Sequence, residues 1–297
     1  MSALTTITAH DVATRLGLDR HPRSWRGDCP ACGYPRTFAV RSGKNGRAKI
    51  YCANCGDREA IDTALNQVFA GSWRPVERPS DADTAARRAR NQETAQKLWN
   101  GSEPAAGTLV DRYLTERGLL GLARSAALRF RPDCWHPEGG RYPAMIAAVT
   151  SMEGELVAVH RTYIARDGRG KASVEPDRAS LGPIWGGAVR LDPVAPELVI
   201  GEGIESSASA GRILGLPAWA ALSAGNLAKG IALPPEVRSV VIAADHDPIA
   251  SNGQRPGQEA AYAAARRWRQ EGRSVRIALP DSVGVDFNDL LRGRHDA

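Results

Sequence analysis

Hydrophobic positions follow two different spacings along this chain of 297 residues, and the change between them divides it into parts. Helical spacing near the N-terminus predicts a short helix over residues 9–18 and a second over residues 57–69. Between them, residues 21–56 are rich in Arg, Gly and Cys and show little helical periodicity. A proline-containing stretch, residues 71–80, interrupts the pattern, and a polar helix is expected over residues 81–100. We therefore expect a small N-terminal module, a linker and a larger second module.

From residue 108 onward, short apolar runs alternate with helical patterns. The runs predict strands over residues 144–149, 156–163, 198–200, 218–222, 239–244 and 274–279. Helices are expected near residues 206–214 and 258–270, between the last four strands. Because strand and helix alternate, the sequence predicts an α/β fold with a mostly parallel sheet flanked by helices.

Four of the five cysteines form two CxxC pairs, Cys29 with Cys32 and Cys52 with Cys55, and 19 residues separate the pairs. This spacing is typical of a zinc site with four thiolate ligands. It favours metal binding in a reducing compartment over a disulfide framework. Since a closed shell of four sulfurs leaves no position for substrate, we expect the Zn²⁺ to be structural.

The stretch between the cysteine pairs predicts two strands, residues 37–42 and 49–52, and therefore a small β zinc ribbon. Residues 20–60 hold nine basic and three acidic side chains, and the net charge of +6 lies within the first 100 residues. Aromatic rings among positive charges are typical of surfaces that bind single-stranded nucleic acid. A ribbon with a merely solvated surface, or one that docks a protein, is the alternative. The candidate DNA-binding residues are Arg36, Phe38, Arg41, Lys49 and Tyr51.

Successive side chains of a strand point to opposite faces, so Arg36 and Phe38 share one face of the first ribbon strand and Arg41 lies on the other. The sequence leaves open which of these two faces also carries Lys49 and Tyr51. Elsewhere, we expect Lys229 to be a surface lysine rather than a nucleotide contact. Three tryptophans of the second module are expected to be core or helix-packing residues rather than to stack on bases. They are Trp185, Trp219 and Trp268.

Acidic residues follow the predicted strands of the second module. Glu202 comes after the strand at 198–200, and Asp245 and Asp247 follow the strand at 239–244. The carboxyl ends of parallel strands form the ligand crevice of an open sheet, so these distant residues can converge there. Carboxylates held together repel one another unless they share a proton or bind a cation, and Mg²⁺ with a phosphate-bearing substrate fits such a set. The chain has no P-loop motif, which argues against a built-in ATP-driven helicase.

Three acidic motifs of the chain resemble those of the Toprim domain, which bacterial-type primases and topoisomerases share. They are Gly201-Glu202-Gly203-Ile204-Glu205, Asp245-His246-Asp247 and Asp286-Phe287-Asn288-Asp289. Ahead of them, the segments Tyr113–Leu119, Leu128–Pro132 and Tyr142–Arg161 resemble the first part of the primase RNA-polymerase domain. With the zinc ribbon in front, the chain resembles a phage- or plasmid-type DNA primase without its helicase part.

The resemblance implies a role for each matching residue. Glu202 would be the catalytic carboxylate, and Asp245 and Asp247 would hold a catalytic Mg²⁺ or Mn²⁺, with Asp286 as an outer member of that metal site. Arg161 and Lys171 would bind nucleotide phosphates or template. The implied partners are a single-stranded DNA template, ribonucleoside triphosphates and a replicative helicase acting in trans.

The expected domains are a zinc-binding domain at residues 1–72, a linker and connecting helix at 73–105, the N-terminal basic part of the RNA-polymerase domain at 106–195 and a Toprim domain at 196–297. The chain shows neither a signal-peptide pattern nor an apolar run long enough to span a membrane, so we expect a cytoplasmic protein without a membrane partner.

Two other functions fit part of this pattern. A non-catalytic recombination or loading factor that binds single-stranded DNA can pair a zinc knuckle with a silent Toprim fold. A Toprim nuclease would use the same carboxylates to cut phosphodiesters. Residues 108–195 favour a primase over the loading factor, because a loading factor has no need of a segment that resembles the polymerase part of primases.

Overall fold

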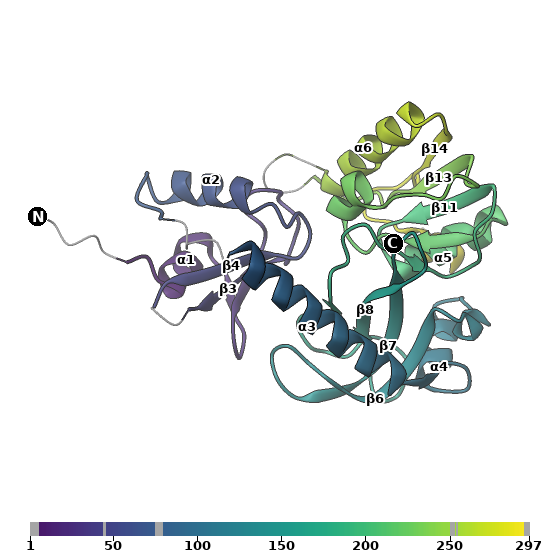
Figure 1. Ribbon diagram of the computed structural model, residues 1–297, viewed down its shortest axis with the longest axis horizontal. Coiled ribbons are helices and arrows are strands. Elements are labelled where there is room, and N and C mark those ends of the chain that lie inside the picture. The colour runs from purple at the N-terminus through teal and green to yellow at the C-terminus, as the bar shows by residue number, and fades with distance from the viewer. Residues whose placement is uncertain (1–5, 44–45, 75–79, 250–252, 254, 294–297) are drawn as a thin grey trace, which may run out of the picture. The chain divides into compact units, whose positions relative to one another are not determined.

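The computed structural model describes residues 6–43, 46–74, 80–249, 253 and 255–293. The chain divides into two compact units, whose elements are labelled in Figure 1. The first unit comprises residues 1–80 and 249–256, and the second comprises residues 81–248 and 257–297. Among the helices in the described ranges, none has both the length and the apolar character needed to cross a bilayer.

The first unit contains a small antiparallel sheet and two helices. The strands lie in sequence order and are β1 (Asp19–Arg20), β2 (Trp25–Gly27), β3 (Phe38–Ser42) and β4 (Ala48–Cys52). The helices are α1 (Ala9–Leu16) and α2 (Arg58–Val68). Thr8 and Asp11 form a capping box that begins α1, because each side chain accepts a hydrogen bond from the backbone of the other.

The core of this unit lies between the sheet and the two helices. Phe38 and Val40 of β3 pack with Ile50 of β4 and with Ile61 and Leu65 of α2. Along β4, buried and exposed residues alternate strictly. This alternation gives the ribbon one face in the core and one face toward solvent.

The second unit begins with an antiparallel sheet of five strands. In spatial order these are β5 (Glu103–Pro104), β6 (Leu128–Trp135), β7 (Arg141–Thr150), β8 (Leu156–Tyr163) and β9 (Arg178–Leu181). The strands expected at 144–149 and 156–163 therefore do not join the parallel sheet. Only five residues separate β7 from β8. So short a connection makes a hairpin, whereas parallel neighbours need a crossover of a dozen residues or more.

Helices cover both faces of this antiparallel sheet. On one face, Ala95 of α3 (Asp81–Asn100) packs against Ile146 and Val159. On the other, Val110 and Tyr113 of α4 (Leu109–Glu116) pack against the opposite sides of β6, β7 and β8. The polar helix expected to connect two modules is thus an integral layer of the second unit.

A second five-stranded sheet in this unit carries most of the parallel pairing. Its spatial order is β10 (Val189–Arg190), β12 (Ala218–Ala220), β11 (Glu197–Gly201), β13 (Ser239–Ala243) and β14 (Ser274–Ala278). All neighbouring strands are parallel except β10, which is antiparallel to β12 at the edge. Three helices belong to this layer: α5 (Ile204–Leu214), α6 (Pro256–Gln270) and α7 (Phe287–Leu291).

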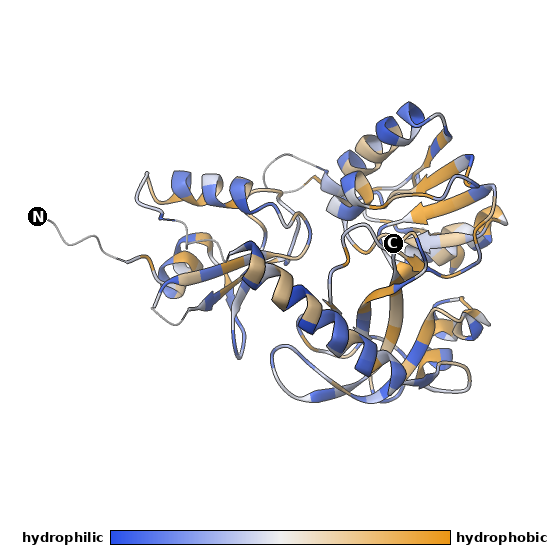
Figure 2. Cartoon of the chain, viewed as in Figure 1, coloured by the Kyte–Doolittle hydropathy of each residue, from blue (hydrophilic) through white to orange (hydrophobic). Residues whose placement is uncertain are grey.

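Alternate residues of the central strands face different helices. Ile200 and Ile242 pack with Trp268 of α6, whereas Val199 and Val241 pack toward α5 and α7. Because both faces are covered, these strands are hydrophobic along their length, as their orange colour in Figure 2 shows. The predicted fold class, a zinc ribbon followed by an α/β part with a parallel sheet flanked by helices, is confirmed in these layers.

Candidate functional site

The four predicted zinc ligands meet in the first unit. The sulfur atoms of Cys29, Cys32, Cys52 and Cys55 all lie within 4.8 Å of one another, and among the described residues they form the single such group of potential metal ligands. Cys32 Sγ and Cys52 Sγ are 3.8 Å apart. A tetrahedral Zn²⁺ with Zn–S bonds of about 2.3 Å requires sulfurs about 3.8 Å apart, so the spacing fits zinc.

Polar groups around the sulfurs supply the hydrogen bonds that stabilise thiolates. The backbone N–H of Asn54 points at Cys52 Sγ at 3.4 Å, and its side-chain amide points at Cys32 Sγ at 3.7 Å. The Thr37 hydroxyl also lies 3.4 Å from Cys52 Sγ but donates to the Tyr34 carbonyl at 3.0 Å, so the donors to the sulfurs are those of Asn54. Such donors orient the ligands and favour their charged form. This arrangement makes the cluster a candidate structural zinc site.

The ribbon presents a basic and aromatic face to solvent. Arg41 pairs with Lys49 across β3 and β4, and Tyr51 lies two residues further along β4 with 62% of its surface exposed. The pairing places Arg26 of β2 beside Ala39 and thus in the same cross-strand row as Tyr51. The side of Arg41, not that of Phe38, therefore joins Lys49 and Tyr51.

Phe38 does not fit its predicted role in DNA binding. Its side chain is fully buried in the core of the ribbon, where it cannot stack on a base. Arg36 is exposed but precedes β3, in a turn where its N–H donates to Asp28 Oδ1 at 3.1 Å. Arg41, Lys49 and Tyr51 remain the candidate nucleic-acid surface of the ribbon.

The predicted acidic residues lie at the carboxyl edge of the parallel sheet. Gly201 and Ala243 are paired at the ends of β11 and β13, so Glu202 and Asp245 follow adjacent strand ends. Asp286 is the N-cap of α7, and its side chain accepts a hydrogen bond from the Asp289 N–H. Asp247 Oδ2 approaches the first turn of α6 so closely that a Cβ at Gly257 would come within 2.8 Å of it. Four carboxylates from the segments that follow β11, β13 and β14 thus reach the same edge.

Asp245 lies at the centre of this group electrostatically. Burial, the charge of Asp286 and the charge of Glu202 raise the pKa of Asp245 to about 7, with a smaller contribution from Asp247. Burial also raises the pKa of Asp247 and of Asp286, and the charge of Asp286 adds to the effect on Asp247. The side chain of Ser206 acts in the opposite direction and partly offsets the rise in the pKa of Asp245.

The donor set fits a divalent metal. Asp245 Oδ1 is buried and has no hydrogen-bond partner among the described residues. An unpaired buried carboxylate oxygen beside other carboxylates is costly unless a cation binds it. The carboxylates are less tightly gathered than the thiolates, as suits Mg²⁺, which keeps several waters and binds through one or two carboxylates plus phosphate oxygens.

A second charged cluster lies beside the first and was missed from the sequence. The Tyr113 hydroxyl of α4 donates to Glu205 Oε1 at 2.6 Å. Burial of Glu205 acts in the opposite direction, but Lys171, Tyr113 and Arg178 together lower the pKa of Glu205 to about 2. Lys171 Nζ also contacts Asp177 Oδ2 at 2.9 Å. The sequence offered one indication of this cluster: Tyr113 and Glu205 each lie in a segment that resembles the primases, Tyr113–Leu119 and Gly201–Glu205.

The other predicted basic residue, Arg161, does not fit a nucleotide contact. It is 3% exposed, and its guanidinium donates to the carbonyls of Ala179, Trp135 and Ser180 at 3.2, 3.2 and 3.3 Å. These bonds connect β8 to β9 and to the end of β6. The geometry therefore gives Arg161 a structural role in the antiparallel sheet, while Lys171 remains a candidate.

Comparison with known proteins agrees with the position of the acidic motifs. Residues 197–296 match the Toprim domain, and residues 89–191 match a domain of unknown function, DUF7146. The match to the Toprim domain spans all three acidic motifs and confirms their resemblance. The chain thus combines a ribbon-like cluster of four cysteines with a C-terminal part that matches the Toprim domain. No curated protein matches the sequence.

Several solved primase structures are similar in fold. The catalytic domain of DnaG primase bound to single-stranded DNA is 17% identical, with 71% of this chain and 77% of that chain covered and a TM-score of 0.47. The zinc-binding and RNA-polymerase domains of Aquifex aeolicus primase are 14% identical, with 97% of this chain and 80% of that chain covered and a TM-score of 0.45. The primase fragment of the bacteriophage T7 primase-helicase is 13% identical, with 92% of this chain and 96% of that chain covered and a TM-score of 0.42.

Loss of one thiolate should remove the zinc and unfold the ribbon. We expect Cys32→Ser to lower the zinc content from one ion per chain and to lower the thermal stability of the first unit, since metal binding contributes directly to folding of such small modules. Elemental analysis and thermal unfolding measure both effects. Cys134→Ser is the matched control for zinc content. Full zinc retention in Cys32→Ser would contradict the assignment.

Replacing Asp245 should stabilise the metal-free protein and abolish its response to metal. The folded pKa of about 7 lies above the ordinary 3.8, so stability falls as pH rises through that window. At pH 8 we expect Asp245→Asn to raise the free energy of unfolding by about 1 kcal/mol or more, since one pKa unit corresponds to about 1.4 kcal/mol.

The measurement is the Tm at pH 5.5 and pH 8, with and without Mg²⁺ or Mn²⁺. Metal should raise the Tm of the wild type by several degrees at pH 8 and leave Asp245→Asn unchanged. Asp281→Asn, at an exposed carboxylate, should behave as the wild type. An undiminished metal response in Asp245→Asn would rule out this residue as a ligand.

The opposite pH dependence is expected for Glu205. Its folded pKa is lowered, so its stabilisation is present above the ordinary value of 4.5 and is lost as pH falls toward about 2. Glu205→Gln should destabilise the protein by about 1–3 kcal/mol at pH 7, because Lys171 and Arg178 lose a charge partner. Urea unfolding at pH 7 and pH 4 should show the deficit shrinking at the lower pH, with the exposed Glu116→Gln as control.

Proposed function

We propose that this chain is a DNA primase, which joins ribonucleotides into short RNA primers on a single-stranded DNA template during replication of a phage, plasmid or other mobile element. The observation that carries the proposal is the Asp245 carboxyl at the edge of the Toprim sheet. Burial and neighbouring charges hold its pKa near 7, and one buried oxygen has no partner among the described residues. Such a site is suited to a divalent cation beside a nucleotide phosphate.

Each acidic residue has a part in this proposal. Asp245 and Asp247 would hold Mg²⁺ or Mn²⁺, with Asp286 as an outer ligand and Glu202 as the catalytic carboxylate on the adjacent strand end. When bound, the metal supplies positive charge that neutralises the charge developing on the α-phosphate. In the proposed reaction the 3′ oxygen of one ribonucleotide would form a bond to the α-phosphorus of the next, the bond from that phosphorus to pyrophosphate would break, and the hydroxyl proton would pass to solvent.

Basic residues of the two units would bind the other groups. Lys171 stays near the carboxylates through its interactions with Asp177 and Glu205, where its ammonium can contact the triphosphate. On the ribbon, Arg41, Lys49 and Tyr51 offer charge for phosphates and a ring for a base, as in proteins that bind single strands. A replicative helicase acting in trans is a further partner in this proposal.

The alternative of a non-catalytic DNA-loading factor is less well supported by the site. A silent Toprim fold has no use for carboxylates kept so close that they raise the pKa of Asp245. Substitution by neutral residues would remove that repulsion at once. The nuclease alternative uses the same carboxylates, so it is separated by its product and not by geometry.

The decisive assay combines the protein with a circular single-stranded template, ribonucleotides and Mg²⁺ or Mn²⁺, and resolves products by length. We expect short RNA chains from the wild type. The double variant Asp245→Ala/Asp247→Ala should lose synthesis by about 100-fold or more, because it removes the groups that hold the charge-neutralising metal. DNA binding should persist in that variant, and Asp281→Ala is the matched control.

Each other product pattern points away from the proposal. Shortening of the template would identify a nuclease. DNA retention without any product would identify a loading factor. Full synthesis by the double variant would show that the carboxylates are not the catalytic site.

A further inference from the structure

Trp185 differs from the other two tryptophans considered with it in the second unit. Trp219 and Trp268 are fully buried, as expected, whereas 59% of the surface of Trp185 is exposed. Trp185 is therefore not a core residue, which leaves packing against a helix as its expected role. A single exposed apolar residue is not unusual, so its meaning depends on how the surrounding chain holds it.

The loop that carries Trp185 is fixed by one buried side chain. Asn226, 1% exposed, donates from Nδ2 to the carbonyls of Gly187 and Ala221 at 2.9 and 2.8 Å. Its Oδ1 accepts the Gly186 N–H at 2.9 Å. A fully satisfied buried amide of this kind rigidifies the segments that it joins. The two residues after Trp185 are thereby attached to the end of β12.

The indole itself is seated on a glycine. A Cβ at Gly230 would come within 3.1 Å of Trp185 Cδ2 and within 2.1 Å of Asn226 Oδ1. Only glycine therefore allows the ring and the amide to pack at this position. The exposed ring has a firm support on one side and solvent on the rest of its surface.

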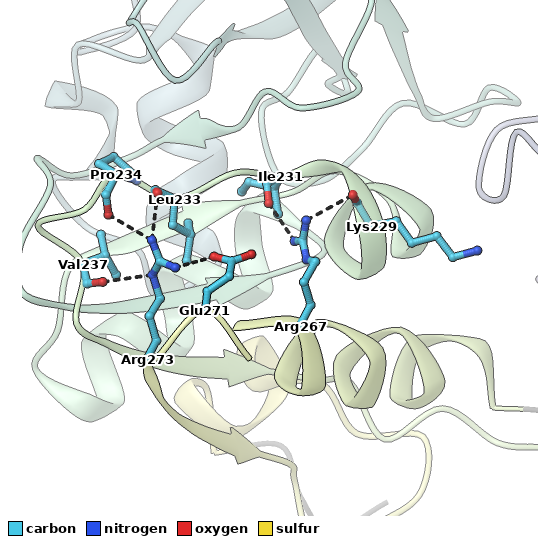
Figure 3. Close-up of polar contacts among 8 residues, drawn as sticks. All are labelled: Lys229, Ile231, Leu233, Pro234, Val237, Arg267, Glu271 and Arg273. Carbon is cyan, nitrogen blue, oxygen red and sulfur yellow. Dashed lines mark hydrogen bonds and ion pairs between the residues drawn. The ribbon is translucent and has the colours of Figure 1, made fainter. Parts of the chain in front are cut away.

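An exposed cation lies next to this support. Lys229 directly precedes Gly230 in the helical turn Asn226–Gly230 and is exposed. Arg267 of α6 donates to the carbonyls of Lys229 and Ile231 at 3.1 and 2.7 Å, which anchors the turn. Figure 3 shows the Lys229 side chain extending away from these contacts. The turn thus carries an exposed lysine one residue before the glycine that supports the ring.

The same segment begins at the acidic edge of the sheet. The N–H of Ala221 donates to the Gly201 carbonyl at 2.9 Å, and the N–H of Leu222 donates to the Glu202 carbonyl at 2.8 Å. Leu222 has a φ of 69°, a left-handed conformation that is uncommon for leucine. The chain therefore leaves the strand end beside Glu202 through a constrained turn and proceeds to Lys229.

We propose that Trp185 and Lys229 form a stacking site for single-stranded nucleic acid on the second unit. The Trp185 ring takes the face of one base, and the Lys229 ammonium pairs with an adjacent phosphate. Base–aromatic stacking tolerates any base, and a nearby cation supplies the charge complementarity to the backbone. The choice of nucleic acid as the occupant rests on the proposed function, whereas the supported ring and cation are properties of the fold.

The test measures binding of a fluorescent oligodeoxythymidine by anisotropy, without nucleotides or metal, in a Tyr51→Ala background that weakens the ribbon surface. Trp185→Ala should weaken binding by about five-fold or more, the loss typical of one stacking aromatic. Trp185→Phe should retain most of the affinity, because it keeps a ring. Tyr262→Ala removes a comparably exposed aromatic of α6 and should have no effect.

A strand in which the bases are replaced by abasic sites separates stacking from charge. On that strand, Trp185→Ala and its parent should bind equally, whereas Lys229→Gln should still weaken binding. Lys229→Gln should also reduce the slope of log K against log salt by about 0.7 on either strand. Thermal unfolding of each variant, unchanged from the parent, shows that an effect on binding is not a loss of folding.

Equal binding of oligodeoxythymidine by Trp185→Ala and its parent would overturn this site. An equal loss on the abasic strand would overturn it too, since the ring would then not act through a base. Because these measurements involve no synthesis, the site can fail while primer synthesis stands, and synthesis can fail while the site stands.

Discussion

The mutual repulsion of carboxylates at the carboxyl edge of one parallel sheet is the constraint on which the second unit depends. Hydrophobic cores on both faces of the sheet fix the ends of β11 and β13 side by side, so Glu202 and Asp245 cannot move apart. Asp286 approaches from the N-cap of α7. The repulsion is therefore built into the fold, and the sheet has to be stable enough to tolerate it. Only a bound cation turns this unfavourable energy into binding energy.

Two acidic residues, Glu205 and Asp245, illustrate how differently the same fold treats a carboxyl group. Glu205 has Lys171, Arg178 and a tyrosine hydroxyl around it, and its pKa falls to about 2. Asp245, next to the start of the same helix, has mainly acidic neighbours, and its pKa rises to about 7. Groups of the protein stabilise the charged form of Glu205, whereas the neighbours of Asp245 destabilise its charged form. This contrast favours a structural role for Glu205 and agrees with the proposed metal binding by Asp245.

Much of this organisation could be predicted from spacing alone. The two CxxC pairs identified the thiolate cluster, and apolar runs located β11, β13 and β14 to within a few residues. Residues that carry chemistry at strand ends could be predicted because parallel strands end at one edge. What the spacing could not show was pairing. The hairpin of β7 and β8 placed two expected strands in a separate antiparallel sheet, because a short connection outweighs the surrounding alternation of strand and helix.

Single side chains were harder to assign than elements, for a related reason. Phe38 and Tyr51 look alike in sequence, and only the register of β3 against β4 sends one into the core and the other to solvent. Likewise, the sequence favoured a nucleotide or template contact for Arg161, whereas in the structure its guanidinium donates to three backbone carbonyls.

Trp185 is the opposite case, since the sequence favours a core or helix-packing role for it, yet 59% of its surface is exposed. The burial of a residue depends on which other segments pack against it. The loop of Trp185 is held by Asn226, which lies 41 positions further along the chain. A residue whose environment comes from so distant a segment cannot be assigned by periodicity. The exposed position of Trp185 also depends on two separate parts of the chain, its own loop and the segment of Asn226 and Gly230 that supports it.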